Sequence, residues 1–383
     1  MRKVLLISQA LNPSLAQLLT EALKDAEITI ITGSEITGHV ISSPPHDPRS
    51  ITSRLKCWIA HWRFVDRWSR EHRTERFDLI FMTSNPPINP MLGLQLKKRH
   101  HAKLVYMNWD LYPQGIEVLM KGVISSSAAA VWHAWNRKNY KKIDQIITIG
   151  NVVAESIQET IPDPLHIEVI PIAVDTREIV PIPKEENPFI RENGLSGKFI
   201  VLYSGKLGRG HDIEGILSAA KHLESVPDIV FVFIGKGEKR HLVEERIQAG
   251  STNLRLFDLQ PREVFFKSIA IGDIGIVAQE KSCAKYFMPS KTYSMMAAGE
   301  AIVGLCSDHD DLQQVIENHG IGYAVKSGDP KELADRIKEL YNNPDLLQEF
   351  QRRSRQTAEE YYSTEAVKQL YETLFDRILG DRT

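Results

Sequence analysis

Short, continuous apolar runs alternate along this chain with longer stretches of helical periodicity, and that alternation constrains the fold more than any other feature. The runs are rich in Val and Ile and lack the polar alternation of a strand with one exposed face. Such runs are typical of parallel sheets that helices cover on both faces. The sequence therefore predicts an α/β protein with doubly wound parallel sheets. The expected strands are 3–8, 28–32, 78–84, 103–108, 145–150, 199–205, 229–235, 254–258, 274–278 and 301–305.

The strand pattern stops at a proline-rich stretch and then begins again, which predicts two domains. At 383 residues the chain is long enough for two or three domains of about 150 residues each. Two doubly wound domains leave a cleft between the carboxyl ends of their sheets, where open α/β folds bind ligands. We expect a Rossmann-like N-terminal domain at 1–175, a linker at 176–197, a Rossmann-like C-terminal domain at 198–360, and a C-terminal helix at 361–383 that packs back on the N-terminal domain.

Composition excludes several other classes of protein. Lys and Arg number 47 against 49 Asp and Glu, so the chain lacks the basic excess of a nucleic-acid-binding protein. The three cysteines are widely spaced with no CxxC pair, which indicates neither a disulfide framework nor a zinc site. No segment approaches the roughly 18 apolar residues of a membrane-spanning helix. We therefore expect a cytoplasmic protein without a metal site.

A glycine-rich turn at 205–212 is the strongest local signal of a binding site. A buried strand runs into three closely spaced glycines, and a helix follows near Asp212. Glycines at such a turn let the backbone approach a phosphate, and basic side chains there favour a diphosphate. The alternative is a tight turn with solvated basic residues. The candidate phosphate-binding residues are Gly205, Lys206, Arg209 and His211.

A second candidate segment, PSKTYSMMAAGEAIV, begins at Pro289 and follows the expected strand 274–278. Proline in the first turn is typical of a helix start, and a helix start there would lie at the same sheet edge as the glycine-rich turn. Ser290 and Lys291 would then complete a clamp for a diphosphate. The alternative is an ordinary helix cap with an exposed lysine.

In their order and spacing these segments resemble the GT-B glycosyltransferases of family 4, also called glycosyl transferase group 1. The C-terminal half carries GKLGRGHD, FIGKGEKRHLVE, PSKTYSMMAAGEAIVG and HGIGYAVKSGDPKELADRIKELYNNP, and the N-terminal half carries TSNPPINPMLG, NWDLYPQG and VIPIAVD. The chain is most similar to the PSK-type subgroup that builds bacterial surface polysaccharides.

The resemblance implies a GT-B fold with an interdomain cleft and a retaining transfer reaction. The donor would be a nucleotide diphosphate sugar, with uridine as the family's preferred base. The acceptor would be a saccharide or a lipid-linked saccharide bound to the N-terminal domain. Basic groups and helix termini would stabilise the departing diphosphate, so no cofactor or metal is expected.

The resemblance also assigns donor-binding roles to particular residues. Lys206 and His211, with Arg209 as the neighbouring candidate, would contact the diphosphate. The turn through Gly235 and Gly237 would let the nucleotide approach, and the backbone of Leu259 and Gln260 would contact the base. Pro289 and Ser290 would hold phosphate and sugar, supplemented by Lys291.

One departure from the family pattern bears on catalysis. Many members carry two glutamates eight positions apart, one near the donor sugar and one on the ribose, whereas this chain has Tyr286 and Ser294 there. Ser294 could hydrogen-bond a ribose hydroxyl, but Tyr286 supplies no carboxylate. Glu280 is the candidate substitute.

Asp110, just after the expected strand 103–108, is the candidate catalytic residue of the N-terminal domain. A carboxylate there could orient or polarise an acceptor hydroxyl. The alternative is that Asp110 caps the turn before Pro113.

The segment 49–103 carries twelve basic and four acidic residues. Within it, spacings of three and four place five apolar residues on one helical stripe with basic neighbours: Leu55, Trp58, Trp62, Val65 and Trp68. Such a helix can lie in an anionic membrane interface or pack on the domain core. The charge excess favours peripheral membrane contact on the cytoplasmic face. The expected membrane or acceptor face comprises Trp58, Trp62, Arg63, Arg67 and Trp68.

Two rival functions remain at this point. A GT-B sugar-nucleotide epimerase would need carboxylates and histidines that the sequence does not place in the cleft. A non-catalytic nucleotide-sugar-binding scaffold is consistent with Tyr286 and Ser294. Product formation would separate the three functions.

Overall fold

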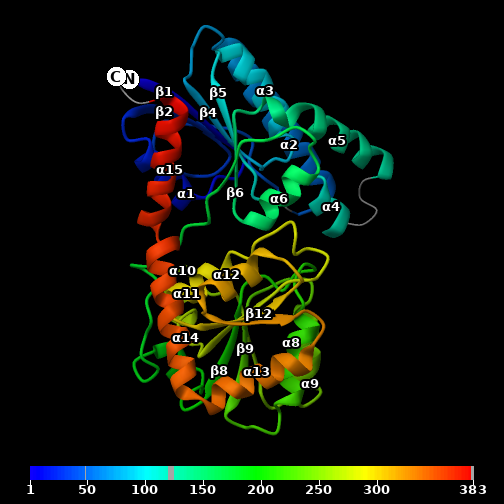
Figure 1. Cartoon of the computed structure of the whole chain (residues 1–383), viewed down its shortest axis with the longest axis vertical. Coiled ribbons are helices and arrows are strands. Elements are labelled where there is room, and N and C mark those ends of the chain that lie inside the picture. Colours follow the sequence, from blue (N-terminus) through cyan, green and yellow to red (C-terminus); the bar gives the residue numbers. More distant parts are fainter. Residues whose placement is uncertain (48, 120–124, 381–383) are drawn as a thin grey trace. The chain divides into compact units, whose positions relative to one another are not determined.

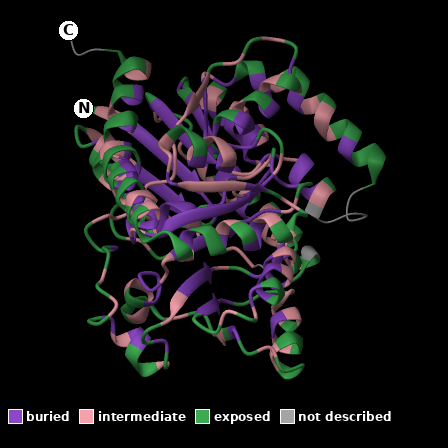
Figure 2. Ribbon diagram, turned by 60° about the horizontal axis from the view of Figure 1, so that its bottom comes forward, coloured by how far each residue is buried: buried purple, intermediate pink, exposed green. Residues whose placement is uncertain are grey.

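The computed structural model describes residues 1–47, 49–119 and 125–380. The chain divides into two compact units: unit 1 comprises Met1–Pro171 and Val367–Thr383, and unit 2 comprises Ile172–Ala366. Each unit is a parallel sheet covered by helices (Figure 1). Strands are mostly buried and helices present exposed faces to solvent (Figure 2). The predicted α/β class is confirmed.

Unit 1 contains a seven-stranded parallel sheet in the order β3-β2-β1-β4-β5-β6-β7. The order reverses between β1 and β4, as in doubly wound folds. In register, Leu5 of β1 pairs with Thr29 on one side and with Ile80 on the other. The strands are β1 (Arg2–Ser8), β2 (Ala26–Thr32), β3 (Val40–Ser42), β4 (Leu79–Thr83), β5 (Lys103–Met107), β6 (Gln145–Thr148) and β7 (Ile167–Val169).

Helices cover the sheet of unit 1, and the last of them comes from the far end of the chain. Phe81 of β4 lies 6.5 Å from Tyr371 and 6.1 Å from Phe375, measured between ring centroids, so this terminal helix packs on the sheet. The helices are α1 (Pro13–Ala22), α2 (Ile51–Glu71), α3 (Asn89–His100), α4 (Gln114–Leu119), α5 (Ser126–Asn139), the short η1 (Tyr140–Lys142), α6 (Asn151–Glu159) and α15 (Thr364–Leu379).

Unit 2 contains a six-stranded parallel sheet in the order β10-β9-β8-β11-β12-β13, again reversing in the middle. Its strands are β8 (Phe199–Ser204), β9 (Ile229–Ile234), β10 (Leu254–Phe257), β11 (Ile274–Ala278), β12 (Ala301–Cys306) and β13 (Gly322–Lys326). Its helices are α7 (Pro188–Glu192), α8 (Ile213–His222), α9 (Arg240–Gln248), α10 (Arg262–Ser268), α11 (Lys291–Ala297), α12 (Asp311–His319), α13 (Pro330–Asn342), α14 (Pro344–Thr357) and the π-helical η2 (Ala358–Tyr362).

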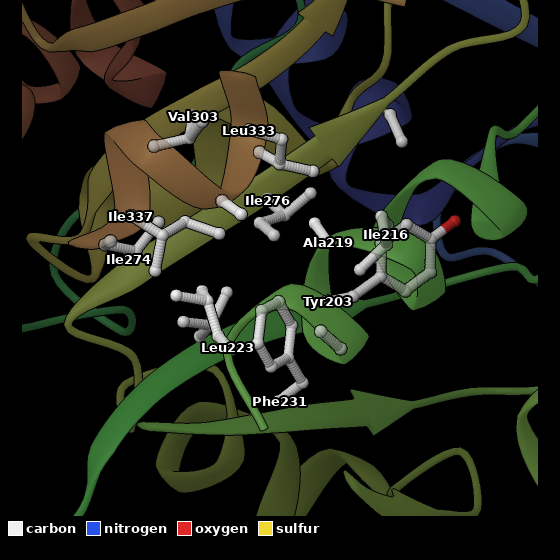
Figure 3. Close-up of a cluster of buried hydrophobic side chains, with 14 of the residues drawn as sticks. Tyr203, Ile216, Ala219, Leu223, Phe231, Ile274, Ile276, Val303, Leu333 and Ile337 are labelled. Atoms are coloured by element: carbon white, nitrogen blue, oxygen red, sulfur yellow. The ribbon is translucent and has the colours of Figure 1, made fainter. Parts of the chain in front are cut away.

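The core of unit 2 fixes the strand ends that carry the candidate donor site. Helices α8 and α13 lay apolar faces on β8, β9, β11 and β12 (Figure 3). Ile216 and Ile337 are 0–1% exposed, and burying a side chain of that size contributes about 1.5–3 kcal/mol. Tyr203, at the end of β8, is part of this core, so the turn that follows begins from a fixed point.

The segment 176–197, predicted as a linker, is part of unit 2. Asn187 donates hydrogen bonds to the carbonyl oxygens of Lys267 and Ala270, at 2.9 and 3.1 Å. Phe189 in α7 is buried. The segment contains several prolines but is not a flexible linker, because its apolar side chains pack against the rest of unit 2.

Candidate functional site

Two loops pack together at the carboxyl edge of the sheet of unit 2. One follows β8 at 205–212 and the other follows β9 at 235–239. Close backbone pairing at this edge gives the glycine-rich turn a defined shape. The three joining hydrogen bonds, 2.8–2.9 Å from nitrogen to oxygen, run from Gly205 to Ile234, from Leu207 to Lys236 and from Lys239 to Leu207.

Gly235 and Gly237 are required by this backbone contact. A Cβ on Gly235 would lie 1.9 Å from the carbonyl oxygen of Gly205, and one on Gly237 would lie 2.3 Å from that of Leu207. Both glycines have φ +151°, which side chains rarely adopt. The sequence predicted that these glycines let a nucleotide approach. The structure shows a different first requirement, since they let the two loops touch.

The side chains of Lys206 and Arg209 are exposed on the glycine-rich turn. Arg209 pairs with Glu238 at 3.8 Å, a long contact between two exposed side chains that contributes little. A Cβ on Gly208 would lie 3.1 Å from Cε of Lys206, so the lysine folds back over the turn. Two positive charges therefore stand at the place where the sequence predicts a diphosphate.

His211 is a neutral group in this structure. Its Nδ1 lies 3.0 Å from the carbonyl oxygen of Ala278. Burial, joined by the positive charge of Lys291, lowers the pKa of His211 to about 4. At neutral pH His211 therefore carries no positive charge, and its predicted contact with the diphosphate stays a prediction. A neutral imidazole can still donate or accept one hydrogen bond there.

Lys291 is not the exposed cap residue that the alternative interpretation described. Its Nζ is buried, without a hydrogen-bond partner, 3.7 Å from the ring centroid of Tyr203. A Cβ on Gly205 would lie 3.2 Å from Cε and 3.3 Å from Nζ of this lysine. Gly205 thus leaves space for Lys291, which reaches the turn from the first position of α11. Burial lowers the pKa of Lys291 to about 7.

Glu280, the candidate substitute carboxylate, is held by Lys239. The Nζ of Lys239 donates to Glu280 at 2.6 Å, to Glu214 at 2.7 Å and to the carbonyl oxygen of His211 at 2.8 Å. Burial disfavours the charged ammonium, but the two carboxylates outweigh burial and raise the pKa of Lys239. Carboxylate oxygens of Asp212, Glu214 and Glu280 lie within 4.8 Å of one another, and this ammonium group partly neutralises them.

The remaining predicted donor residues lie on two loops of unit 2, after β10 and after β11, and in α11. Leu259 after β10 is 54% exposed, and Gln260 bonds the carbonyl oxygen of Asp258 at 2.7 Å. Ser290 precedes α11 and makes no side-chain cap. Pro289 is buried, and Tyr286 and Ser294 are half-buried.

In unit 1, Asp110 follows β5 and interacts with Tyr112. Burial raises the pKa of Asp110, and a hydrogen bond with Tyr112 partly offsets that effect. The positive charge of Arg54, on α2, acts on both Tyr112 and His46. In the neighbouring loop, Ser84 accepts a hydrogen bond from the backbone of the residue before Asp110, at 3.3 Å. The carboxyl edge of this sheet thus places a carboxyl, a phenol and a guanidinium in one region.

The tryptophan stripe on α2 packs partly against unit 1. Val65, within the stripe, is 0% exposed, and Trp68 stacks on His72 with ring centroids 4.5 Å apart. Trp58, Trp62 and Trp68 are all half-buried, whereas Arg63 and Arg67 are exposed. The predicted membrane or acceptor face on α2 stays a prediction. The large apolar side chains that α2 does expose are Leu55 and Ile59, at 47% and 49%.

Sequence reasoning missed Lys239 and Tyr203. Lys239 lies two residues after Gly237 in the loop that follows β9, so its position at a strand end was the available signal. Tyr203 was treated as a strand residue only, and nothing in the sequence shows that its ring covers an amine.

Comparison with known families identifies the chain. The Glycosyltransferase Family 4 profile matches residues 14–178, and the Glycosyl transferases group 1 profile matches residues 198–343. Together the two matches span most of both units. The protein belongs to the GT-B glycosyltransferases, with a family 4 N-terminal half and a group 1 C-terminal half.

Curated relatives include proteins of polysaccharide synthesis. The probable glycosyltransferase WbjE of Pseudomonas aeruginosa is 27% identical over 276 residues, covering 70% of this chain and 67% of WbjE. The putative colanic acid biosynthesis glycosyl transferase WcaI of Escherichia coli K12 is 28% identical over 144 residues, 37% of this chain and 35% of WcaI.

Solved structures share the fold at low sequence identity. Sucrose-phosphate synthase of Thermosynechococcus elongatus aligns with a TM-score of 0.75 at 16% identity, covering 98% of this chain and all of that one. HepE of Anabaena, solved in complex with UDP-glucose, aligns with a TM-score of 0.71 at 15% identity, covering 98% and 99% of the two chains. These likenesses establish the GT-B fold.

Proposed function

We propose that this glycosyltransferase moves a sugar, with retention of anomeric configuration, from a UDP-sugar to a saccharide or lipid-linked saccharide during surface-polysaccharide synthesis. The observation that carries the proposal is the convergence of Lys206, Arg209 and Lys291 on one glycine-rich turn of unit 2. WcaI is named for colanic acid biosynthesis, which supports a role in polysaccharide synthesis. HepE was solved in complex with UDP-glucose, which supports uridine as the base of the donor.

In this reaction the bond between the donor's anomeric carbon and the diphosphate oxygen breaks, and its electron pair leaves with the diphosphate. The acceptor hydroxyl oxygen forms the new bond to that carbon and gives up its proton. Lys206 and Lys291 would stabilise the negative charge that develops on the leaving diphosphate. Because cationic side chains can supply this stabilisation, we propose that transfer needs no metal cofactor.

Asp110 is the proposed group that orients the acceptor hydroxyl on unit 1. Its interaction with Tyr112 fixes the carboxyl group, and the raised pKa brings it nearer to the range useful for accepting a proton. Arg54, whose charge acts on Tyr112, would favour an acceptor that carries a phosphate, as a lipid-linked saccharide does.

Peripheral membrane contact on the cytoplasmic face is a further part of the proposal. Exposed Leu55 and Ile59 on α2 stand beside exposed Lys56, Arg63 and Arg67. Apolar and basic side chains on one helix favour an anionic lipid interface. Within the described ranges 1–47, 49–119 and 125–380, no helix is both long enough and apolar enough to cross a bilayer.

The alternative with a specific observation in its favour is a non-catalytic nucleotide-sugar-binding protein. Tyr286 and Ser294 replace the glutamate pair, and Glu280 is engaged by Lys239. A GT-B epimerase is the other rival.

One experiment separates the three functions. The protein is incubated with radiolabelled UDP-glucose, UDP-galactose or UDP-N-acetylglucosamine, with and without lipid extracts that contain lipid-linked saccharides. A glycosyltransferase labels the lipid fraction and releases UDP. An epimerase converts the donor without an acceptor, and a scaffold binds the donor and changes nothing.

A further inference from the structure

The side chain of Lys291 has an unusual environment for a residue expected to contact a diphosphate. Its ammonium end is buried, while the nearest aromatic ring, that of Tyr203, lies 3.7 Å away. No hydrogen-bond acceptor reaches the Nζ within the described part of the chain. A cation–π contact replaces only part of the hydration that a buried ammonium loses. Burial without an acceptor therefore favours the neutral amine.

The groups around Lys291 do not supply a counter-charge. Tyr203 comes from β8, and the loop after β8 contributes Lys206 and His211. The positive charges of Lys291 and Lys206 both act on His211. Lys239, from the next loop, adds a further positive charge. The nearby carboxylate of Glu280 is bonded to Lys239 at 2.6 Å. Burial alone lowers the pKa of Lys291 to about 7.

The location of this amine matters as much as its environment. Gly205 would contact Cε and Nζ of Lys291 at 3.2 and 3.3 Å if it carried a Cβ, so the amine lies directly against the turn proposed to hold the donor's phosphates. A diphosphate at that turn would bring two negative charges beside it. An adjacent anion favours the charged form of an amine and raises its pKa.

We propose that Lys291 is neutral in the free protein and takes up one proton from solvent when the donor's diphosphate binds, so that donor binding and protonation are coupled. The inference rests on the proposed function, because it takes a nucleotide diphosphate as the ligand. The amine then serves as a charge that is created only in the complex and faces the leaving group. Donor affinity above neutral pH is therefore limited by the protonation of this one residue.

The coupling has a sign that can be worked out. At pH 8 a group with a pKa of about 7 is about one-tenth protonated, so binding takes up about 0.9 proton. At pH 6 the amine already carries its proton and no uptake is expected from it. Above pH 8 the dissociation constant should rise about tenfold per pH unit. His211 would give the opposite profile, since a rise of its pKa from about 4 yields uptake near pH 6 and little at pH 8.

The test is calorimetric titration of the full chain with UDP at pH 6 and pH 8, each in buffers of different ionisation enthalpy. Relative to the Lys291→Arg variant, the wild-type protein should take up close to one further proton at pH 8 and none further at pH 6. The difference removes the proton exchange of the terminal phosphate of UDP, whose second pKa is about 6. Lys291→Arg, which keeps its charge at both pH values, should bind UDP without proton uptake at pH 8. His211→Gln is the matched control and should keep the uptake at pH 8.

Binding of UDP without proton uptake at pH 8 would overturn the inference and leave the proposed function intact. Absence of binding by UDP would count against the UDP-sugar donor and the inference together. A measurement on the wild-type protein alone guards against variants that do not fold: nitrogen-15 resonances of the lysine side chains are followed from pH 5 to 10. A lysine that titrates near pH 7 supports the inference, and titration of every lysine above pH 9 contradicts it.

Discussion

The carbonyl oxygen of Gly205 lies so close to Gly235 that a Cβ on Gly235 would be only 1.9 Å from that oxygen. The two residues directly follow adjacent parallel strands, β8 and β9, and their contact joins the two loops that form the candidate donor site. The shape of this site therefore depends on the absence of a side chain at one position.

Gly235→Ala should destabilise unit 2 by roughly 2–4 kcal/mol, because the methyl group meets backbone and the residue has positive φ. Urea unfolding measures the effect. Gly250→Ala is the matched control, since Gly250 also has positive φ, +96°, but a Cβ there meets nothing within 4 Å. Equal destabilisation in the two variants would show that the loop contact is unimportant.

Lys239→Met should weaken nucleotide binding by about ten- to a hundredfold, since Lys239 ties the carbonyl oxygen of His211 to Glu214 and Glu280. Loss of the ammonium leaves the two carboxylates facing each other and lets the glycine-rich turn move. Calorimetry with UDP measures the change. Lys326→Met, which removes an exposed pair with Asp308, should bind UDP as the wild type does. Unchanged binding by Lys239→Met would refute this role.

Asp110→Asn should reduce sugar transfer by at least about a hundredfold while leaving UDP binding unchanged, because the residue belongs to unit 1. The raised pKa predicts the direction of the pH dependence: the active carboxylate is lost as pH falls through that pKa, so transfer declines on the acid side. Asp163→Asn, which breaks an exposed pair with Lys141, is the control. Full transfer activity in Asp110→Asn would exclude the proposed role.

The double substitution Leu55→Ser and Ile59→Ser should reduce sedimentation with phosphatidylglycerol vesicles severalfold, because these are the exposed apolar side chains of α2. Leu370→Ser, at an exposed position of α15, is the control for loss of an apolar side chain elsewhere. Equal sedimentation of the double variant and the wild type would place membrane contact elsewhere or exclude it.

Continuous apolar runs were sufficient to predict the two parallel sheets, because a strand buried on both faces needs apolar residues at every position. Three strands lack this pattern and were missed: β3 and β7, each three residues long, and β13, whose first residues are half-buried. The position of the glycine-rich turn could also be predicted. The burial and charge of its side chains could not be predicted. The environment of the Lys291 amine includes the ring of Tyr203, whose position the sequence alone does not give. The membrane role of the α2 stripe stays a prediction, because the same spacing suits a core face and a membrane face.

Nucleotide binding to the glycine-rich turn is the central claim, and a thermal-shift panel of UDP, GDP, ADP and TDP on wild type and Lys206→Ala tests it most directly. A nucleotide at 100 times its dissociation constant should stabilise the wild-type protein by about 2.7 kcal/mol. UDP should give the largest shift, and Lys206→Ala, altered at an exposed residue, should fold normally and lose most of that shift. No shift with any nucleotide, or an equal shift in both proteins, would contradict the account.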